Sequence, residues 1–230
     1  MKLKSRRIWI APTVVVAVGA IVAFVLFRQG EGPEVAARTI AEAIVNNDPR
    51  AMYKYESELE SNALGLTEEK YVDFWNKVVS PKLEGLTPED NFRSYPTNEG
   101  TTGVGELYLT DGSGSRFLYD GWVDVEDDGR PRNFLVHSKL IQAWLIDYMR
   151  ARRIRSNESL SDVDMLYAYV EGARRDAPLL REIGIEGFAS HEEIGKVRTW
   201  DEFIIWCQEQ IKKREDPNFG KPTPPRPPVR

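Results

Sequence analysis

Few side chains in this 230-residue sequence could carry out acid–base or metal chemistry near neutral pH. Its two histidines are His137 and His191. The zinc-hydrolase signature His-Glu-x-x-His is not present at His191, because its fifth position is Gly195. Instead, Ser190 and Glu193 have the spacing of a helix capping box, and we expect His137 to be structural at the end of a strand. The sequence therefore predicts neither a metal site nor a bound cofactor.

Thiol chemistry depends on one residue, Cys207. A chain with one cysteine cannot form an intramolecular disulfide or build a metal site from several thiolates. Cys207 shares a helical stripe with apolar side chains, namely Trp200, Phe203, Ile204 and Ile211. This spacing predicts a small buried hydrophobic side chain. The alternatives are a redox thiol and an intermolecular disulfide.

The first part of the predicted fold that positions candidate residues is a series of helices. Pro33 and the acidic residue after it predict a helix start. Asn46-Asn47 ends this helix, and Asp48 caps a second one, which we expect over residues 49–58. Thr67 caps a third helix, whose apolar side chains recur at helical spacing and whose end is predicted at Pro81.

From Phe92 the hydrophobic period changes from helical to alternating, and turn-forming Asn, Asp and Gly residues separate the apolar runs. Along residues 115–127, one face carries Phe117, Tyr119, Val123 and Val125, and the other carries Asp120, Trp122 and Asp124. This pattern predicts an antiparallel meander of about four strands, which ends at His137.

Helical spacing returns after His137. Leu140, Trp144 and Tyr148 are expected to face inward and Lys139 to be exposed. A polar stretch near residue 154 predicts a boundary between an α+β domain and a helical C-terminal unit. The expected divisions are 33–154 for the domain, 155–216 for the unit, with helices at 161–175, 178–183 and 199–215, and 217–230 for a proline-rich disordered tail.

The N-terminal region predicts a membrane anchor. Residues 8–27 are an uncharged run of twenty residues, and a helix of that length covers roughly 30 Å, the thickness of a bilayer's hydrocarbon core. A cleaved signal peptide is the alternative, but residues 24–32 offer no small-residue cleavage pair. Basic residues before the span predict that residues 1–7 are cytoplasmic and that the body is extracytoplasmic, as in a single-pass inner-membrane protein.

The charge of the body excludes one class of partner. Residues 1–30 hold five of the 31 basic residues and none of the 36 acidic ones, so residues 31–230 have a net charge of 26 − 36 = −10. An acidic surface repels phosphate backbones, whereas nucleic-acid binders carry basic stripes. We therefore expect no nucleic-acid partner.

The two runs PEVAARTIAEAIVNNDPRAMYKYESELE (33–60) and LTEEKYVDFWNKVV (66–79) have a recognisable arrangement of small, aliphatic and aromatic residues. They resemble the helical start of the nuclear-transport-factor-two-like superfamily, particularly its bacterial membrane-anchored extracytoplasmic members. The resemblance covers about residues 33–138 and implies three helices packed on a curved antiparallel sheet. It departs from the superfamily where the chain continues into helices after Lys139.

In that superfamily the helices and the concave sheet face form a cone that serves as an enzyme pocket, a ligand site or an interaction surface. Members resembling ketosteroid isomerases and dehydratases use a carboxylate or histidine base with hydrogen-bond donors in an apolar pocket. By residue type alone, the catalytic candidates here are Asp120, His137 and Tyr53. The pocket candidates are Tyr53, Tyr55, Trp75 and Trp122.

These observations favour a membrane-anchored extracytoplasmic binding or assembly module without catalysis. The expected interactions are with the membrane through residues 8–27, and with a protein partner or a second copy. Two alternatives stay open: a small-molecule-binding, isomerase- or dehydratase-type enzyme that uses the cone, and a structural spacer of an envelope or secretion assembly.

Overall fold

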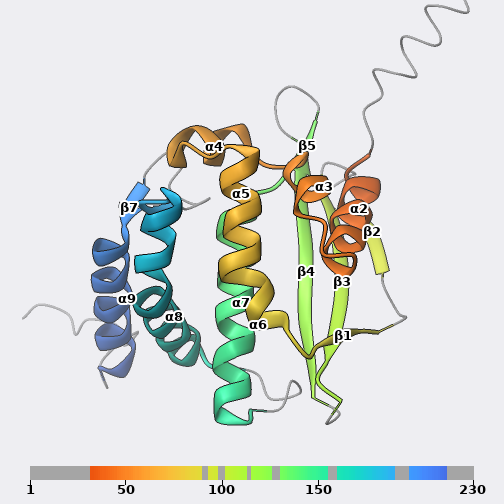
Figure 1. Cartoon of the computed structure of the whole chain (residues 1–230). Coiled ribbons are helices and arrows are strands. Elements are labelled where there is room, and N and C mark those ends of the chain that lie inside the picture. Colours follow the sequence, from red (N-terminus) through yellow and green to blue (C-terminus); the bar gives the residue numbers. More distant parts are fainter. Residues whose placement is uncertain are drawn as a thin grey trace, which may run out of the picture.

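The computed structural model is an α+β structure in which helices pack on an antiparallel sheet (Figure 1). The residues that it describes are 32–89, 93–97, 102–112, 115–125, 130–154, 160–189 and 197–216. The predicted cytoplasmic end, the transmembrane segment, the capping box at Ser190 and the proline-rich tail lie outside these ranges. Among the helices of the described ranges, none has both the length and the apolar character needed to cross a membrane.

The predicted break between the first two helices is confirmed. α2 (Pro33–Val45) is followed by α3 (Pro49–Tyr53), and the carboxylate of Asp48 caps α3 by accepting a hydrogen bond from the Ala51 amide at 3.1 Å. Between the helices, Asn47 has a φ of 51°. Asparagine tolerates this left-handed conformation better than most residues, so the Asn-Asn pair allows a tight turn.

The second helix is shorter than predicted, because α3 ends at Tyr53 and a separate helix, α4 (Glu58–Leu64), begins after four intervening residues. The residues between them form main-chain hydrogen bonds with a distant segment: the Asn133 amide donates to Tyr55, and the Ser57 amide donates to Asn133. These bonds hold the chain in an extended bridge, so the helix cannot continue to residue 58.

The third helix begins at the predicted cap but does not end where predicted. Thr67 caps α5 (Glu68–Phe74), and a π-helical turn, η1 (Trp75–Val79), leads into α6 (Ser80–Leu83). The prediction that Pro81 stops the helix is wrong. Proline is tolerated in the first turn of a helix, and the change to π-helical bonding places Pro81 in the first turn of α6.

The sheet is built around β3 (Thr102–Thr110). β4 (Arg116–Val125) pairs antiparallel along one side of β3, and β5 (Pro131–Arg132) pairs with β4. On the other side of β3, the short strands β1 (Thr87–Pro88) and β2 (Arg93–Thr97) pair with opposite ends of it and lie end to end. The described sheet therefore has five strands, where the sequence predicts about four.

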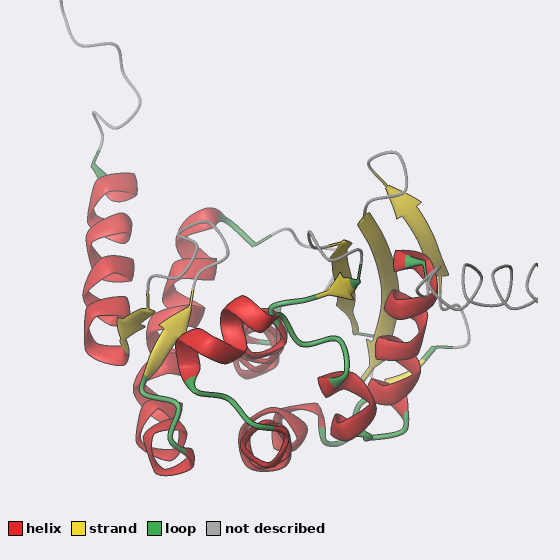
Figure 2. Ribbon diagram, turned by 90° about the horizontal axis from the view of Figure 1, so that it is seen from above, coloured by secondary structure: helices red, strands yellow, loops and turns green. Residues whose placement is uncertain are grey.

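The predicted alternation along β4 is confirmed for its inward face, since Phe117, Tyr119 and Val123 are buried. Helix α2 packs against the same sheet (Figure 2). Its first turn is so close to β3 that a Cβ added at Gly103 would lie 2.1 Å from the Pro33 carbonyl oxygen. Glycine at residue 103 is thus required for the contact between this helix and the sheet.

Helix α7 (Leu135–Arg152) overturns two predictions. His137 does not end a strand, because the strand is confined to Pro131–Arg132 and His137 lies in the first turn of the helix. Lys139 is not exposed; its side chain is fully buried, and its ammonium lies 4.9 Å from the centroid of the Tyr119 ring. A long aliphatic stem lets lysine cover apolar surface in this way.

The described part of the C-terminal region, residues 160–189 and 197–216, contains fewer helical elements than predicted. α8 (Asp162–Ile183) is one continuous helix with Pro178 inside it, not two elements at 161–175 and 178–183. The buried side chains of Ala177 and Leu180 continue the packing face past the proline. The predicted capping box of Thr199 and Glu202 is confirmed at the start of α9 (Trp200–Glu215), after the two-stranded pair β6 (Gly187–Ala189) and β7 (Val197–Thr199).

α8 and α9 lie on the side of α7 that faces away from the sheet (Figures 1 and 2). Buried apolar side chains on both sides of the predicted 154/155 division belong to one cluster. The helices approach closely, since a Cβ at Gly172 of α8 would lie 2.2 Å from the Trp144 ring of α7. The predicted burial of Cys207 is confirmed, and burial raises the pKa of its thiol to about 12.

Candidate functional site

The structure places the predicted site residues in different surroundings. The hydroxyl of Tyr53 donates to the Leu66 carbonyl at 3.2 Å, and its ring packs against Tyr71. Tyr55 is buried beside the extended bridge. The His137 ring packs on Phe188, with its Nδ1 2.9 Å from the Ala189 carbonyl oxygen. These contacts are structural ties between elements.

The remaining three predicted residues divide into two groups. Trp75 lines an open cleft, and its indole N–H donates to the Asn47 side chain at 2.6 Å. Asp120 and Trp122 lie in β4, where they pair in register with Glu106 and Val104 of β3. The structure does not describe the side chains of Asp120 and Trp122, so the roles of Asp120 as a base and of Trp122 as a pocket residue stay predictions.

The cleft has a volume of about 450 Å³ and lies between the end of α2, the helical stretch η1–α6 and strands β1 and β3. Its lining consists mostly of apolar side chains from these elements: Ile44, Val45, Trp75, Pro81, Leu83, Leu86, Pro88 and Leu109. Some of this apolar surface is open to solvent, since Val45 is 46% exposed. A volume of this size is within the range of ligand-binding pockets.

Two departures from regular helix shape this cleft. The left-handed turn at Asn47 brings its side chain to Trp75 and fixes the indole at the base of the cleft. On the opposite side, Gly85 has a φ of 78° and redirects the chain from α6 toward β1. The cleft is therefore built from the same Asn-Asn corner that separates the first two helices.

The described lining of the cleft is suited to non-covalent binding. Glu84 supplies the one ionisable side chain of the described lining. General acid–base catalysis needs at least one group of tuned pKa placed against a reacting atom, usually with a second polar group. An apolar surface with a single carboxylate instead suits an apolar ligand that carries a positive charge.

A second site, the carboxyl pair of Glu56 and Glu60, lies in the interior. Glu60 is fully buried, and its two oxygens accept hydrogen bonds from the amides of Val136 and His137 at 3.0 and 2.8 Å. Its side chain also hydrogen-bonds to that of Glu56, which is 4% exposed. Burial raises the pKa of Glu60 to about 7, although these three hydrogen bonds oppose the shift.

The groups around this carboxyl pair are also buried. Tyr71 of α5 and Tyr119 of β4 are fully buried, and the pKa of Tyr71 is raised by burial and by the negative charge of the nearby carboxyl pair. The Lys139 ammonium, over the Tyr119 ring, donates to the Gln142 side chain at 3.2 Å. The pair thus lies within packed side chains, and Glu60 serves as the N-terminal cap of α7.

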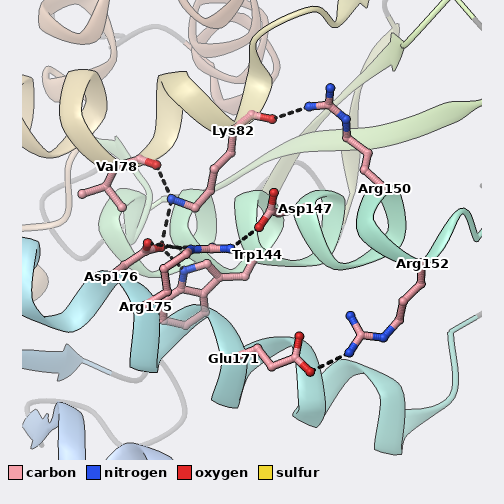
Figure 3. Close-up of polar contacts among 9 residues, drawn as sticks. All are labelled: Val78, Lys82, Trp144, Asp147, Arg150, Arg152, Glu171, Arg175 and Asp176. Atoms are coloured by element: carbon pink, nitrogen blue, oxygen red, sulfur yellow. Dashed lines mark hydrogen bonds and ion pairs between the residues drawn. The ribbon is translucent and has the colours of Figure 1, made fainter.

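A third polar cluster joins α6, α7 and α8 (Figure 3). We call it the ionic network, and it consists of Lys82, Trp144, Asp147, Arg175 and Asp176. The carboxylate of Asp176 lies 2.9 Å from the Lys82 ammonium, 3.0 Å from Arg175 and 2.6 Å from the Trp144 indole nitrogen. Arg175 also pairs with Asp147, and Lys82 donates to the Val78 carbonyl at 2.6 Å.

Burial and charge oppose each other in the ionic network. Burial alone would raise the pKa of Asp176, but the bonds from Arg175, Lys82 and Trp144 outweigh it and lower that pKa. For Lys82, burial prevails over the attraction of Asp176 and lowers the pKa of the ammonium. The Asp176 carboxylate has three donors, whereas the Lys82 ammonium is paired with one carboxylate. This difference explains why the pKa of Asp176 follows its partners and the pKa of Lys82 follows burial.

Sequence reasoning predicted that Trp144 faces inward but did not identify the buried charged residues of the two polar clusters. Glu60 bonds to residues 76 and 77 positions away, and no local pattern identifies such a partner. Lys139 shares a helical face with Val136, Leu140 and Ala143, all of them buried, and this spacing is a signal that could have placed it inside. Asp176 offers no comparable signal in the chain.

Comparison of the chain with family models, with curated proteins and with solved structures found no match. The resemblance to the nuclear-transport-factor-two-like superfamily therefore stays a prediction.

Proposed function

We propose that this chain is a membrane-anchored extracytoplasmic module that binds a protein partner without catalysis. The observation that carries the proposal is the open apolar cleft with Glu84 as its single ionisable lining residue. The predicted anchor at residues 8–27 and the basic residues before it support attachment with the body outside the cytoplasm.

The occupant that we propose for the cleft is an apolar segment of a partner protein that carries a basic residue. The apolar lining matches the apolar part, and the exposed Glu84 side chain at the rim matches the basic residue. The net charge of −10 over residues 31–230 favours a basic partner over an acidic one. Anionic lipid headgroups are disfavoured by the same argument.

Site-specific photo-crosslinking of the full chain in intact membranes tests this proposal. The crosslinker replaces Val45, which lines the cleft, and a matched control carries it at Ile205 of α9, which is 55% exposed. We expect a protein adduct from residue 45 and not from residue 205. Mass spectrometry of the adduct should identify a partner peptide with apolar and basic residues.

A second measurement distinguishes specific binding of the partner in the cleft from non-specific crosslinking. With the identified partner purified, Glu84→Arg should weaken its binding about tenfold or more, and the effect should shrink in high salt, because like charges repel at the rim. Adducts only with lipid, with a second copy or with residues 217–230 would contradict the proposal, as would unchanged affinity of the Glu84 variant.

One observation favours the enzyme alternative as a second candidate. The raised pKa of Glu60, about 7, is suited to a general base at neutral pH. It ranks second because Glu60 is fully buried and both of its oxygens accept hydrogen bonds from the main chain. A small molecule that raises the melting temperature of the wild-type chain but not of Glu60→Gln would favour this candidate.

A further inference from the structure

The carboxyl pair of Glu56 and Glu60 has a place in the fold that the proposed function does not use. The two residues lie four positions apart in the chain, Glu56 just before α4 and Glu60 in its first turn, and both are buried, with exposed fractions of 4% and 0%. Glu60 reaches across to the first turn of α7 and accepts hydrogen bonds from two successive amides.

A buried carboxyl pair in contact holds one proton. Two ionised carboxylates offer only acceptors, so the hydrogen bond between Glu56 and Glu60 requires a proton on one of them. The repulsion between two negative charges away from water also disfavours the doubly ionised state. The amides at the start of α7 carry partial positive charge, which suits a pair with one negative charge.

The groups that face the pair determine how a change in its charge is transmitted. They are Tyr71 of α5, Tyr119 of β4 and, from α7, His137 and Lys139. His137 is the transmitting residue, because its amide donates to Glu60 while its ring contacts Phe188 and the Ala189 carbonyl in β6. Movement of the first turn of α7 therefore reaches β6.

We propose that Glu56 and Glu60 form a proton-sharing clamp at the start of α7, and that loss of the shared proton loosens the junction of α4, α7 and β6. The clamp is a pH-sensitive device built into the fold. It is independent of what binds in the cleft.

The direction of the pH effect follows from proton linkage. Burial raises the pKa of Glu60 from its ordinary value of 4.5 to about 7, so the folded chain binds more protons than the unfolded chain between these values. The contribution to stability is complete below pH 4.5 and is lost as the pH rises through about 7. In this window the unfolding equilibrium constant should rise by up to about tenfold per pH unit.

Urea unfolding of the full chain in detergent, at pH values from 5 to 9, tests the clamp. Glu60→Gln keeps an acceptor for α7 and a donor for Glu56 but cannot titrate, so the pH-dependent rise between pH 5 and 7 should be missing. Glu58→Gln, on the same helix with a side chain that is 69% exposed, should keep the wild-type slope. Equal slopes for wild type and Glu60→Gln would overturn the proposal.

A measurement on the wild-type chain covers the case in which Glu60→Gln does not fold. Carbon-13 NMR of labelled glutamate carboxyls should show one group with a midpoint near 7. Amide exchange at Val136 and His137, corrected for its intrinsic pH dependence, should accelerate above that midpoint. Titration of every glutamate below about pH 5 would overturn the clamp.

Discussion

The carboxyl pair of Glu56 and Glu60 and the ionic network around Asp176 bury carboxylates in opposite ways. Burial raises the pKa of Glu60 to about 7 against the hydrogen bonds that its carboxyl makes, whereas two cations and an indole N–H outweigh burial at Asp176 and lower its pKa. Both side chains are less than one-tenth exposed. The difference shows that burial alone favours the neutral form of a carboxyl group, and that adjacent cations can reverse this effect.

The two sites should therefore respond to pH with opposite signs. The stability that Glu60 contributes is lost as the pH rises, whereas the stability that Asp176 contributes is lost as the pH falls. Each site also joins different elements: the carboxyl pair holds α4 to α7, and the ionic network holds α8 to α6 and α7.

Removal of the Asp176 carboxylate should have the largest effect on stability. Asp176→Ala leaves the Lys82 ammonium, whose side chain is 11% exposed, without its buried partner, and the Trp144 N–H without its acceptor. We expect a loss of about 3–5 kcal/mol in the free energy of unfolding, measured with urea. Asp201→Ala, at an exposed pair whose Asp side chain is 80% exposed, is the matched control and should cost less than about 1 kcal/mol.

Removal of the Glu60 carboxylate should cost less, because the groups that lose a partner are two main-chain amides and the Glu56 carboxyl, and none of them is a cation. Glu60→Ala leaves the amides of Val136 and His137 without their acceptor, and we expect a loss of about 2 kcal/mol at pH 6. A loss equal to that of Asp176→Ala would show that the distinction between the two sites is wrong.

The acid side of the stability profile sharpens the comparison. Because the pKa of Asp176 is lowered in the folded chain, its contribution is present above the ordinary value of 3.8 and is lost as the pH falls through the folded value. Below pH 4 this loss should reach up to about 1.4 kcal/mol per pH unit. In thermal or urea unfolding, the stability of Asp176→Asn should depend less on pH below about pH 4 than the stability of the wild type. An unchanged pH dependence would contradict the lowered pKa of Asp176.

The smallest effect is expected at an exposed ion pair between the same helices. Arg152 of α7 and Glu171 of α8 lie 2.6 Å apart, with side chains 38% and 50% exposed. Glu171→Gln removes the charge and leaves Arg152 over the Tyr148 ring. We expect a change below about 1 kcal/mol that disappears in 1 M salt; a larger, salt-independent loss would mean that exposure does not set the strength of these pairs.

Local signals in the sequence predicted the elements whose ends depend on their own residues. The turn at Asn47, the caps at Asp48, Thr67 and Thr199, and the alternation along β4 all follow from short-range hydrogen bonding or side-chain period. The predicted stop at Pro81 failed because a preceding π-helical turn changes the bonding pattern. The predicted division between helices at 161–175 and 178–183 failed because buried side chains continue the packing face past Pro178.

The sites were less predictable than the elements. Trp75, one of the predicted pocket residues, lines the cleft, and an aromatic residue at the centre of a wide apolar face is easy to recognise in a sequence. The other walls of the cleft come from residues 80–88 and from β3, whose approach to α2 depends on tertiary packing. Buried Glu60, Lys139 and Asp176 acquire their roles from partners far away in the chain.

Pro88, in the short strand β1, has a consequence for how the protein meets other chains. β1 pairs with β3 on one side and contributes Pro88 to the wall of the cleft. Proline has no N–H, so a strand from another molecule finds no donor at this edge position. The edge thus resists intermolecular strand pairing and the aggregation that such pairing begins.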